Sequence, residues 1–331
     1  FSKGIGQVTS KLGPMAMGLT AATQAAYALQ AAVLASIDSA KQFEAQFAVV
    51  RAITTGNATS FAQLESSVMA VSAATEHSNA SLLGAAEVFG RAGFKAEEIG
   101  DALATTADLA TAAGMDISKA ANLSVRMLKS FGKSMDQLPQ IANMLAKASA
   151  SANVNIESLR EGFKFAGAIA ETVGLEFADV TTALSLLGET GLEAGLAGRA
   201  LQAMIMNLAK PTERAKKKML ALGITTHDAA GKMLPLETIL RQLKDSNISA
   251  GDSFQIFNSN AARAVTALVR NVDKYKEFNK EVETATVALE DQSSVIRDTY
   301  DVALKNLDNN FTNLGKNLGD IFLPSLTAVT K

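Results

Sequence analysis

Helix-ending glycines recur through the middle of the chain at intervals of about 20 residues, and this regularity constrains the fold more than any other feature. Each is followed by an apolar residue and then by a polar or acidic residue that can start a helix. A glycine after a helix accepts the left-handed backbone that ends it. Repetition of this unit predicts a stack of short helices, which is typical of a structural scaffold more than of an enzyme. The repeats stand at Gly93-Phe94, Gly114-Met115, Gly174-Leu175 and Gly191-Leu192, with a weaker Gly132 and Asn153-Val154 between them.

Composition supports an all-α fold and excludes several kinds of function. Apolar residues make up 48% of the chain but aromatic residues only 5%, and the apolar share is mainly Ala, Leu and Val, which suits closely packed helices. The absence of Cys excludes a disulfide framework, thiolate catalysis and zinc–thiolate sites. The net charge of −2 gives no electrostatic footprint for nucleic acid, so we expect no sequence-specific nucleic-acid partner, and we interpret the basic run 216–218 as a solvated helix face.

The central part of the chain, residues 56–290, is predicted to be a compact helical body. Polar caps mark helix starts at Asp116, at Asn155, and at the capping boxes Ser60 with Gln63 and Ser134 with Gln137. One stretch near 224–234 reads as a small β-hairpin, because two short β-prone segments flank a tight turn with Gly231 at its left-handed position. The expected helices span 60–75, 80–91, 95–113, 116–131, 135–151, 156–172, 176–189, 194–208, 211–222, 236–246, 252–271 and 274–288.

Two long helices with heptad spacing are predicted to flank this body, one within residues 1–55 and one within residues 291–331. The first starts near Pro14 and reaches about residue 53, whereas the second runs from about 293 to 322, where Pro324 ends or kinks it. Apolar residues at 3–4 spacing form a seam that can pair such helices with each other or with copies of the chain. The predicted self-association seam comprises Leu19, Ala22, Ala26, Leu29, Val33, Phe43, Phe47, Leu304, Leu307, Phe311, Leu314 and Leu318.

The predicted fold is therefore all-α, a compact stack of short helical hairpins with one small β-hairpin, flanked by two long heptad-bearing helices. The seam makes a homo-oligomer the expected state, with three copies about a common axis as the first expectation. The segment 12–37 adds a second interpretation, because it is uncharged and long enough to span a bilayer. Its Ala content and its two Gln oppose insertion, so a coiled-coil seam and a membrane-active segment both stay open.

Side chains that commonly carry catalysis are few and scattered. His77 and His227 are the only histidines, they are far apart in sequence, and neither belongs to a metal-binding motif. The acidic pair 97–98 lies in the first turn of a helix, where carboxylates favour the positive end of the helix dipole. Gly191, Gly195 and Gly198 lack the Gly-Lys-Ser/Thr signature of a phosphate-binding loop and do not follow a strand. We predict no catalytic, cofactor-binding or metal-binding residue, and no enzyme.

An ordered series of segments resembles the core region of phage tail tape measure proteins. The likeness runs from about Phe43 to Leu268, and no single motif in it is specific. One departure is at Ile256-Phe257-Asn258, where the family would have Gly after Phe, which puts a local turn in doubt. The segments that carry the resemblance are 43–53, 92–99, 109–116, 146–150, 191–199, Pro211-Thr212 and Leu222-Gly223-Ile224, followed by Asp228, Gly231 and Leu234-Pro235.

The resemblance implies a structural virion protein without catalytic residues in this core. Such a protein lies in several copies in the tail tube lumen, sets tail length, nucleates tube assembly and enters the host ahead of the DNA. Its implied partners are tail tube proteins, tail-tip or baseplate proteins and, during ejection, the host envelope and its membrane. Two other classes compete with this interpretation: a membrane channel for DNA passage formed by segment 12–37, and a peptidoglycan hydrolase that would depend on carboxylates alone.

Overall fold

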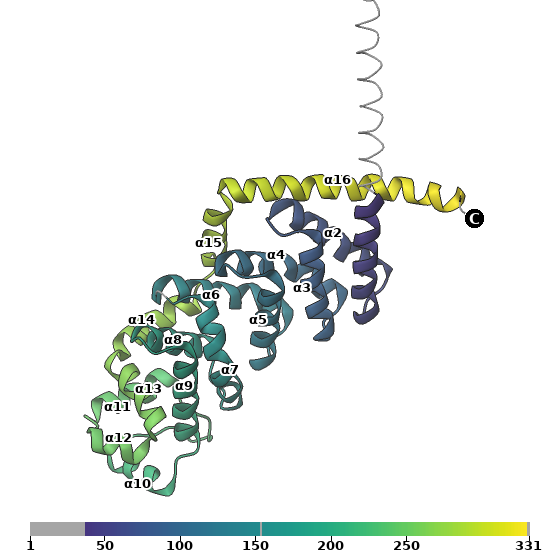
Figure 1. The fold of residues 1–331 in the computed structure, drawn as a ribbon. Coiled ribbons are helices and arrows are strands. Elements are labelled where there is room, and N and C mark those ends of the chain that lie inside the picture. Colours follow the sequence, from purple (N-terminus) through teal and green to yellow (C-terminus); the bar gives the residue numbers. More distant parts are fainter. Residues whose placement is uncertain (1–36, 153, 330–331) are drawn as a thin grey trace, which may run out of the picture.

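The computed structural model describes residues 37–152 and 154–329, and within these ranges the chain is all-helical, as predicted (Figure 1). A helical segment at 37–53 comes first. The further elements are α2 (Ala58–Ala74), α3 (Asn79–Arg91), α4 (Ala96–Ala113), α5 (Ile117–Ser130), the 3₁₀ turn η1 (Met135–Gln137), α6 (Leu138–Ala152), α7 (Ile156–Thr172), α8 (Phe177–Glu189), α9 (Ala194–Ala209), α10 (Glu213–Ala221), α11 (Leu236–Asp245), α12 (Ala250–Ile256), α13 (Ser259–Arg270), α14 (Val272–Glu283), α15 (Ala288–Arg297) and α16 (Tyr300–Val329).

The helix-ending glycines act as the sequence predicts. Gly114 follows α4 with φ of 60°, and the N–H of Met115 returns to the carbonyl of Ala110 at 3.0 Å. Gly174 repeats the arrangement after α7, where the N–H of Leu175 reaches the carbonyl of Ala170 at 2.9 Å. This bonding satisfies carbonyls that a helix end leaves open and turns the chain sharply. The chain therefore reverses direction at each of these glycines, and the next helix begins.

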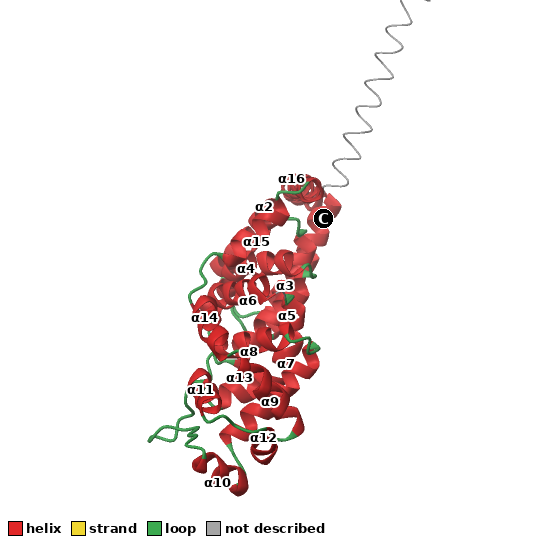
Figure 2. Cartoon of the chain, turned by 90° about the vertical axis from the view of Figure 1, so that its left-hand side faces the viewer, coloured by secondary structure: helices red, strands yellow, loops and turns green. Residues whose placement is uncertain are grey.

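Alternate helices, rather than consecutive ones, make most of the packing. One row contains α2, α4, α6 and α8, and a second row contains α3, α5, α7 and α9, as Figure 1 shows. Beyond α9 the chain returns, with α13 against α9, α14 against α8 and α6, α15 against α6 and α4, and α16 against α2. The first described helix and α16 thus lie at one end of an elongated body, and α10 lies at the other (Figures 1 and 2).

Small residues bring neighbouring helices of one row close together. Where α7 meets α9, a Cβ placed on Gly198 would lie 2.5 Å from the backbone oxygen of Gly162, so only glycine fits. Larger side chains fill the core on either side, including a cluster in which Phe131, Phe163 and Phe177 have ring centroids 5.0–6.0 Å apart. The Ala-rich composition is therefore used for close helix approach.

The predicted β-hairpin does not form. The stretch near 224–234 keeps the turn at Gly231, with φ of 81°, but only one isolated antiparallel bridge joins His227 to Met233, and the described residues contain no strand (Figure 2). Pro235 then caps α11 and stops the second segment from extending. A short pair of segments with no sheet beside it is not held as strands.

Several predicted boundaries are also wrong. The expected helix 252–271 is broken into α12 and α13 at Phe257, because Asn258 caps α13. The expected last helix from 293 is divided between α15 and α16, and α16 continues past Pro324 to Val329. The first capping box is formed by Asn57 with Ser60, so α2 starts earlier than predicted.

Candidate assembly interface

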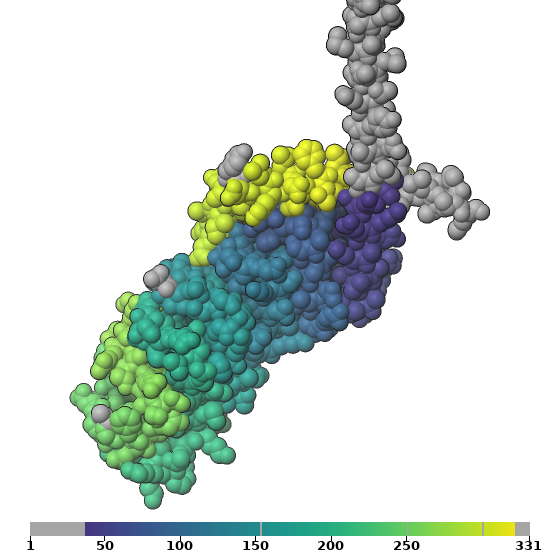
Figure 3. Space-filling model, in the orientation of Figure 1, coloured from purple at the N-terminus to yellow at the C-terminus, as the bar shows by residue number. Residues whose placement is uncertain are grey.

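One face of α16 presents a continuous apolar stripe to solvent. Its six side chains are between 42% and 66% exposed, and Figure 3 shows the helix as a ridge along the edge of the body. Their spacing alternates between three and four residues, which places them on one side of the helix. Exposed apolar stripes of this length are typical of interaction surfaces. The α16 stripe consists of Leu304, Leu307, Phe311, Leu314, Leu318 and Ile321.

The opposite face of α16 is polar and buried. Asn309 donates to the carbonyl of Thr75 at 3.0 Å, and Asn313 accepts a hydrogen bond from Asn79 at 2.6 Å. Both asparagines are buried against the turn that joins α2 and α3. The helix is thus attached through hydrogen bonds while its apolar side faces outward, the reverse of an ordinary surface helix.

Lys316 fixes the polar face by its charge. Its ammonium pairs with Glu65 on α2, lies 2.9 Å from Asp320, and stands 4.7 Å from the ring centroid of Phe43. Burial by itself would lower the pKa of Lys316, but the two carboxylates outweigh that effect and raise the pKa. Because this buried charge is held by partners from α2 and the helix 37–53, it favours one specific position of α16 on the body.

A second polar cluster anchors α15 just before α16. Arg297 pairs with Asp108 on α4 and lies 3.6 Å from Glu76, which in turn accepts a hydrogen bond from Thr111 at 2.5 Å. Burial raises the pKa of Glu76, yet the Thr111 hydroxyl and nearby positive charges reverse this and lower the pKa below its ordinary value. Burial lowers the pKa of the neighbouring His77, whose Nε2 lies 3.2 Å from the Ala107 carbonyl. These groups serve to hold α15 in place.

The N-terminal part of the predicted seam has a different outcome. Phe43 and Phe47 are buried, stack on each other with centroids 5.8 Å apart, and Phe47 also meets Phe61 on α2. Their assignment to a self-association seam is wrong, because the chain's own core covers them. Five predicted members lie outside the described residues: Leu19, Ala22, Ala26, Leu29 and Val33.

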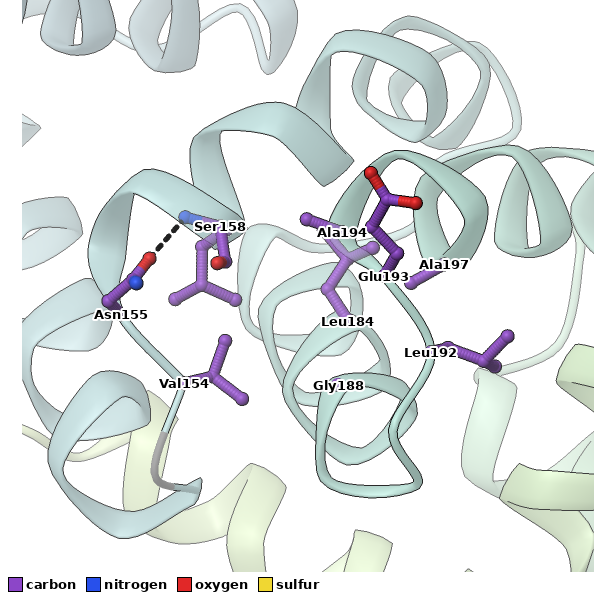
Figure 4. A pocket seen from close by; sticks show the side chains of 10 residues that line it. Val154, Asn155, Ser158, Leu184, Gly188, Leu192, Glu193, Ala194 and Ala197 are labelled. Atoms are coloured by element: carbon purple, nitrogen blue, oxygen red, sulfur yellow. Dashed lines mark hydrogen bonds between the residues drawn. The ribbon is translucent and has the colours of Figure 1, made fainter.

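Hollows also open on the described part of the body, one near α10 lined by His227, Thr226 and Glu213, and one between α7, α8 and α9. The one drawn in Figure 4 is lined by apolar and small residues from α7, α8 and α9, together with Glu193, Ser158 and Asn155. Asn155 already caps α7 through a 2.7 Å hydrogen bond to the N–H of Ser158. A single carboxylate beside a capping amide does not provide an acid–base pair.

The described residues offer neither a metal-binding cluster nor a membrane-spanning helix. They contain no cluster of three or more His, Asp or Glu that could hold a metal ion. His77 and His227 lie on different parts of the fold, the latter hydrogen-bonded to Thr226 at 2.8 Å.

None of the described helices is sufficiently long and apolar to cross a bilayer. Nearly all of segment 12–37 lies outside these residues, so both interpretations of it stay predictions.

Comparison with known proteins decides the family. Residues 65–288, about two thirds of the chain, match the family model described as phage-related minor tail protein. The chain belongs to this family. The chain is 29% identical over 238 residues to the tape measure protein of Pneumococcus phage Dp-1, covering 72% of the chain and 20% of that relative. It is 23% identical over 163 residues to the probable tape measure protein of Escherichia phage P2, covering 49% of the chain and 20% of that relative.

These matches confirm the resemblance to tape measure proteins that the sequence suggested. The chain spans about a fifth of the length of the curated relatives it matches. No solved structure matches it. The α16 stripe therefore belongs to a chain of a tail-protein family with relatives named tape measure proteins.

Sequence reasoning found the apolar side of α16 but missed the polar side. The signal was present as asparagines at helical spacing between the apolar positions, Asn306, Asn309, Asn313 and Asn317. Asparagine is a poor helix former, so a row of asparagines along a long helix indicates that their side chains form hydrogen bonds with another part of the protein. Which surface would accept those hydrogen bonds could not be read from the sequence.

Proposed function

We propose that this chain is a folded module of a phage tail tape measure protein, and that copies of it associate through the α16 stripe. The observation that carries the proposal is the orientation of α16, with its polar face fixed to the body and its apolar face free. Exposed heptad spacing is what knobs-into-holes packing between parallel helices requires. Support for the tail role comes from the two relatives named tape measure proteins.

The architecture supports a docking role for the body more than a measuring role. A continuous helix advances about 1.5 Å per residue and so measures length in proportion to its sequence. Short helices that run back on one another do not add length in this way. The body formed by α2–α15 is therefore proposed to dock at one end of the tail, with α16 and the N-terminal seam leading toward the measuring segment.

Assembly in the virion follows from the same arrangement. We place three copies around the axis of the tail tube lumen, where they meet tube proteins and tail-tip or baseplate proteins and help to start tube assembly. During ejection the chains leave ahead of the DNA and enter the host envelope. The module is proposed to act without catalysis or cofactors, and the likeness to two relatives named tape measure proteins supports a structural role.

Tail length provides the test. Removal of residues 60–290 from the tape measure gene, with tails examined by electron microscopy, should reduce the number of tails, leave the length of those that form unchanged and abolish infectivity if the body is a docking module. A body that contributed to the ruler as stretched helix would shorten the tail by about 350 Å, at about 1.5 Å per deleted residue. That shortening would contradict the docking role, and complementation by the intact gene is the control.

A further inference from the structure

Charge is distributed unevenly along the molecule. Residues 194–270 form α9–α13 and their connecting loops, here called the distal lobe, at the end of the body away from α16 (Figure 3). The distal lobe contains eleven Lys and Arg but five Asp and Glu, a charge of +6, whereas the remainder of the chain carries −8. The whole-chain charge of −2 conceals this separation. Clustered charge of one sign attracts a partner of the opposite sign.

Most of these cations are free to meet a partner. Three of the eleven, Lys218, Arg241 and Lys244, form ion pairs with carboxylates. Within the described part of the chain, the other eight form no ion pair, and all eight are exposed. They are Arg199, Lys210, Arg214, Lys216, Lys217, Lys232, Arg263 and Arg270. The positive charge is therefore presented to solvent instead of being neutralised inside the fold.

Two adjoining hollows make a groove among these cations. The first, of about 450 Å³, lies where α9 meets the start of α13 and has no acidic residue in its lining. The second, of about 430 Å³, shares Lys210 with the first, adds Lys216, and has Glu213 as its single carboxylate. Polar side chains that line the first hollow are Arg199, Gln202, Asn207, Lys210, Asn258 and Asn260.

The groove combines cations and neutral hydrogen-bond donors that suit an anionic chain. The Arg199 guanidinium lies over the ring of Phe165, 4.9 Å from its centroid, so it is held in place without a carboxylate that would cancel its charge. The side-chain amides supply neutral donors, and in protein–DNA complexes half or more of the hydrogen bonds run to phosphate and sugar. Cations in a row beside neutral donors match a phosphodiester backbone, which repeats its charge regularly, better than an acidic peptide, whose charges are irregular.

We propose that the distal lobe binds the backbone of double-stranded DNA, without reading its sequence, along the groove marked by Arg199, Lys210 and Lys216. The contacts are to phosphates. Affinity is in the range of non-specific binding, roughly 10⁻⁴–10⁻⁶ M at physiological salt. This site is independent of the α16 stripe, which lies at the other end of the body.

Fluorescence anisotropy with a labelled DNA duplex and the whole 331-residue chain tests the proposal. Affinity should fall as salt rises, with a log–log slope of about −3 for three phosphate contacts. Each of R199Q, K210Q and K216Q should reduce that slope by about 1 and weaken binding to all sequences equally. The triple variant should lose most of the affinity. The matched control is K305Q, which removes an exposed cation from α16.

Four results would overturn the proposal. They are no DNA binding at low salt, an equal loss of affinity in K305Q, a strong preference for one DNA sequence, and displacement of the DNA by poly-L-glutamate at equal charge. The last result would assign the groove to an acidic protein instead. Circular dichroism of each variant shows that the fold is intact, which is expected because all three substituted side chains are exposed.

Discussion

Replacement of two leucines at the centre of the α16 stripe should separate the copies of this protein without unfolding it. Leu307 and Leu314 are 53% and 54% exposed, so about half of each side chain is still available for burial in an interface. Full burial of a Leu side chain contributes about 2 kcal/mol, and half of that is about 1 kcal/mol. The double variant L307A/L314A therefore loses about 2 kcal/mol of association free energy per chain, close to 30-fold in the association constant.

Sedimentation equilibrium over a wide range of protein concentration measures that difference. The wild-type chain should form an oligomer, three copies in our proposal, and the double variant should dissociate at concentrations where the wild type does not. Alanine favours helix, and the two leucines touch solvent, so thermal unfolding of the separated chain should change little. The matched control is M206A/L220A, which removes exposed apolar side chains at the far end of the body.

Three outcomes would refute the reasoning. The wild-type chain could stay monomeric at high concentration, the control could dissociate as far as the stripe variant, or the stripe variant could unfold at a much lower temperature. The first would mean that another protein covers the stripe. The second would mean that general surface hydrophobicity drives association. The third would mean that the stripe faces the body and not solvent.

Three further predictions concern the fold. G198A should destabilise the body by about 2 kcal/mol or more, since its Cβ would meet the backbone of Gly162, and denaturant unfolding measures the loss. K316A should leave Glu65 without its buried partner and free α16, so hydrogen exchange in α16 should accelerate while that of α7–α9 does not. Acidification below about pH 6.5, the ordinary pKa of His77, should lower stability because the fold keeps that imidazole neutral, and H77Q should reduce this loss in melts across pH 5–7.

Each of these has a control and a contrary result. Ala substituted for Gly93, where a Cβ would meet nothing within 4 Å, tests the cost of the left-handed backbone alone; equal losses in both glycine variants would refute the close contact. K305A is the control for Lys316, and equal protection of α16 in K316A and wild type would show that the charge does not hold the helix. For His77, the sign follows from its lowered pKa, since the unfolded chain binds the proton first as the pH falls. Unchanged pH dependence in H77Q would remove it as the cause.

Local rules account for most of what the sequence predicted correctly. The positions of Gly114 and Gly174 and the caps Asp116 and Asn155 follow from hydrogen bonds within a few residues, so they can be read without knowledge of the fold. The all-α class follows from the same signals, repeated along the chain. The hairpin failed for a non-local reason, because strands at 224–234 would have needed a neighbouring sheet.

The sequence by itself determined the all-α class, where glycine ends several helices, and that two sets of apolar residues follow heptad spacing. Only the tertiary structure decided which heptad residues stay available: Phe43 and Phe47 are covered by the core, whereas the α16 stripe is exposed. It also decided that Asn309 and Asn313 form the attached face and that Asn258 and Asn260 line one hollow with Arg199 and Lys210. Helix periodicity identifies a face, but the contacts of that face depend on residues 200 or more positions away, as in the 234-residue separation of Asn79 and Asn313.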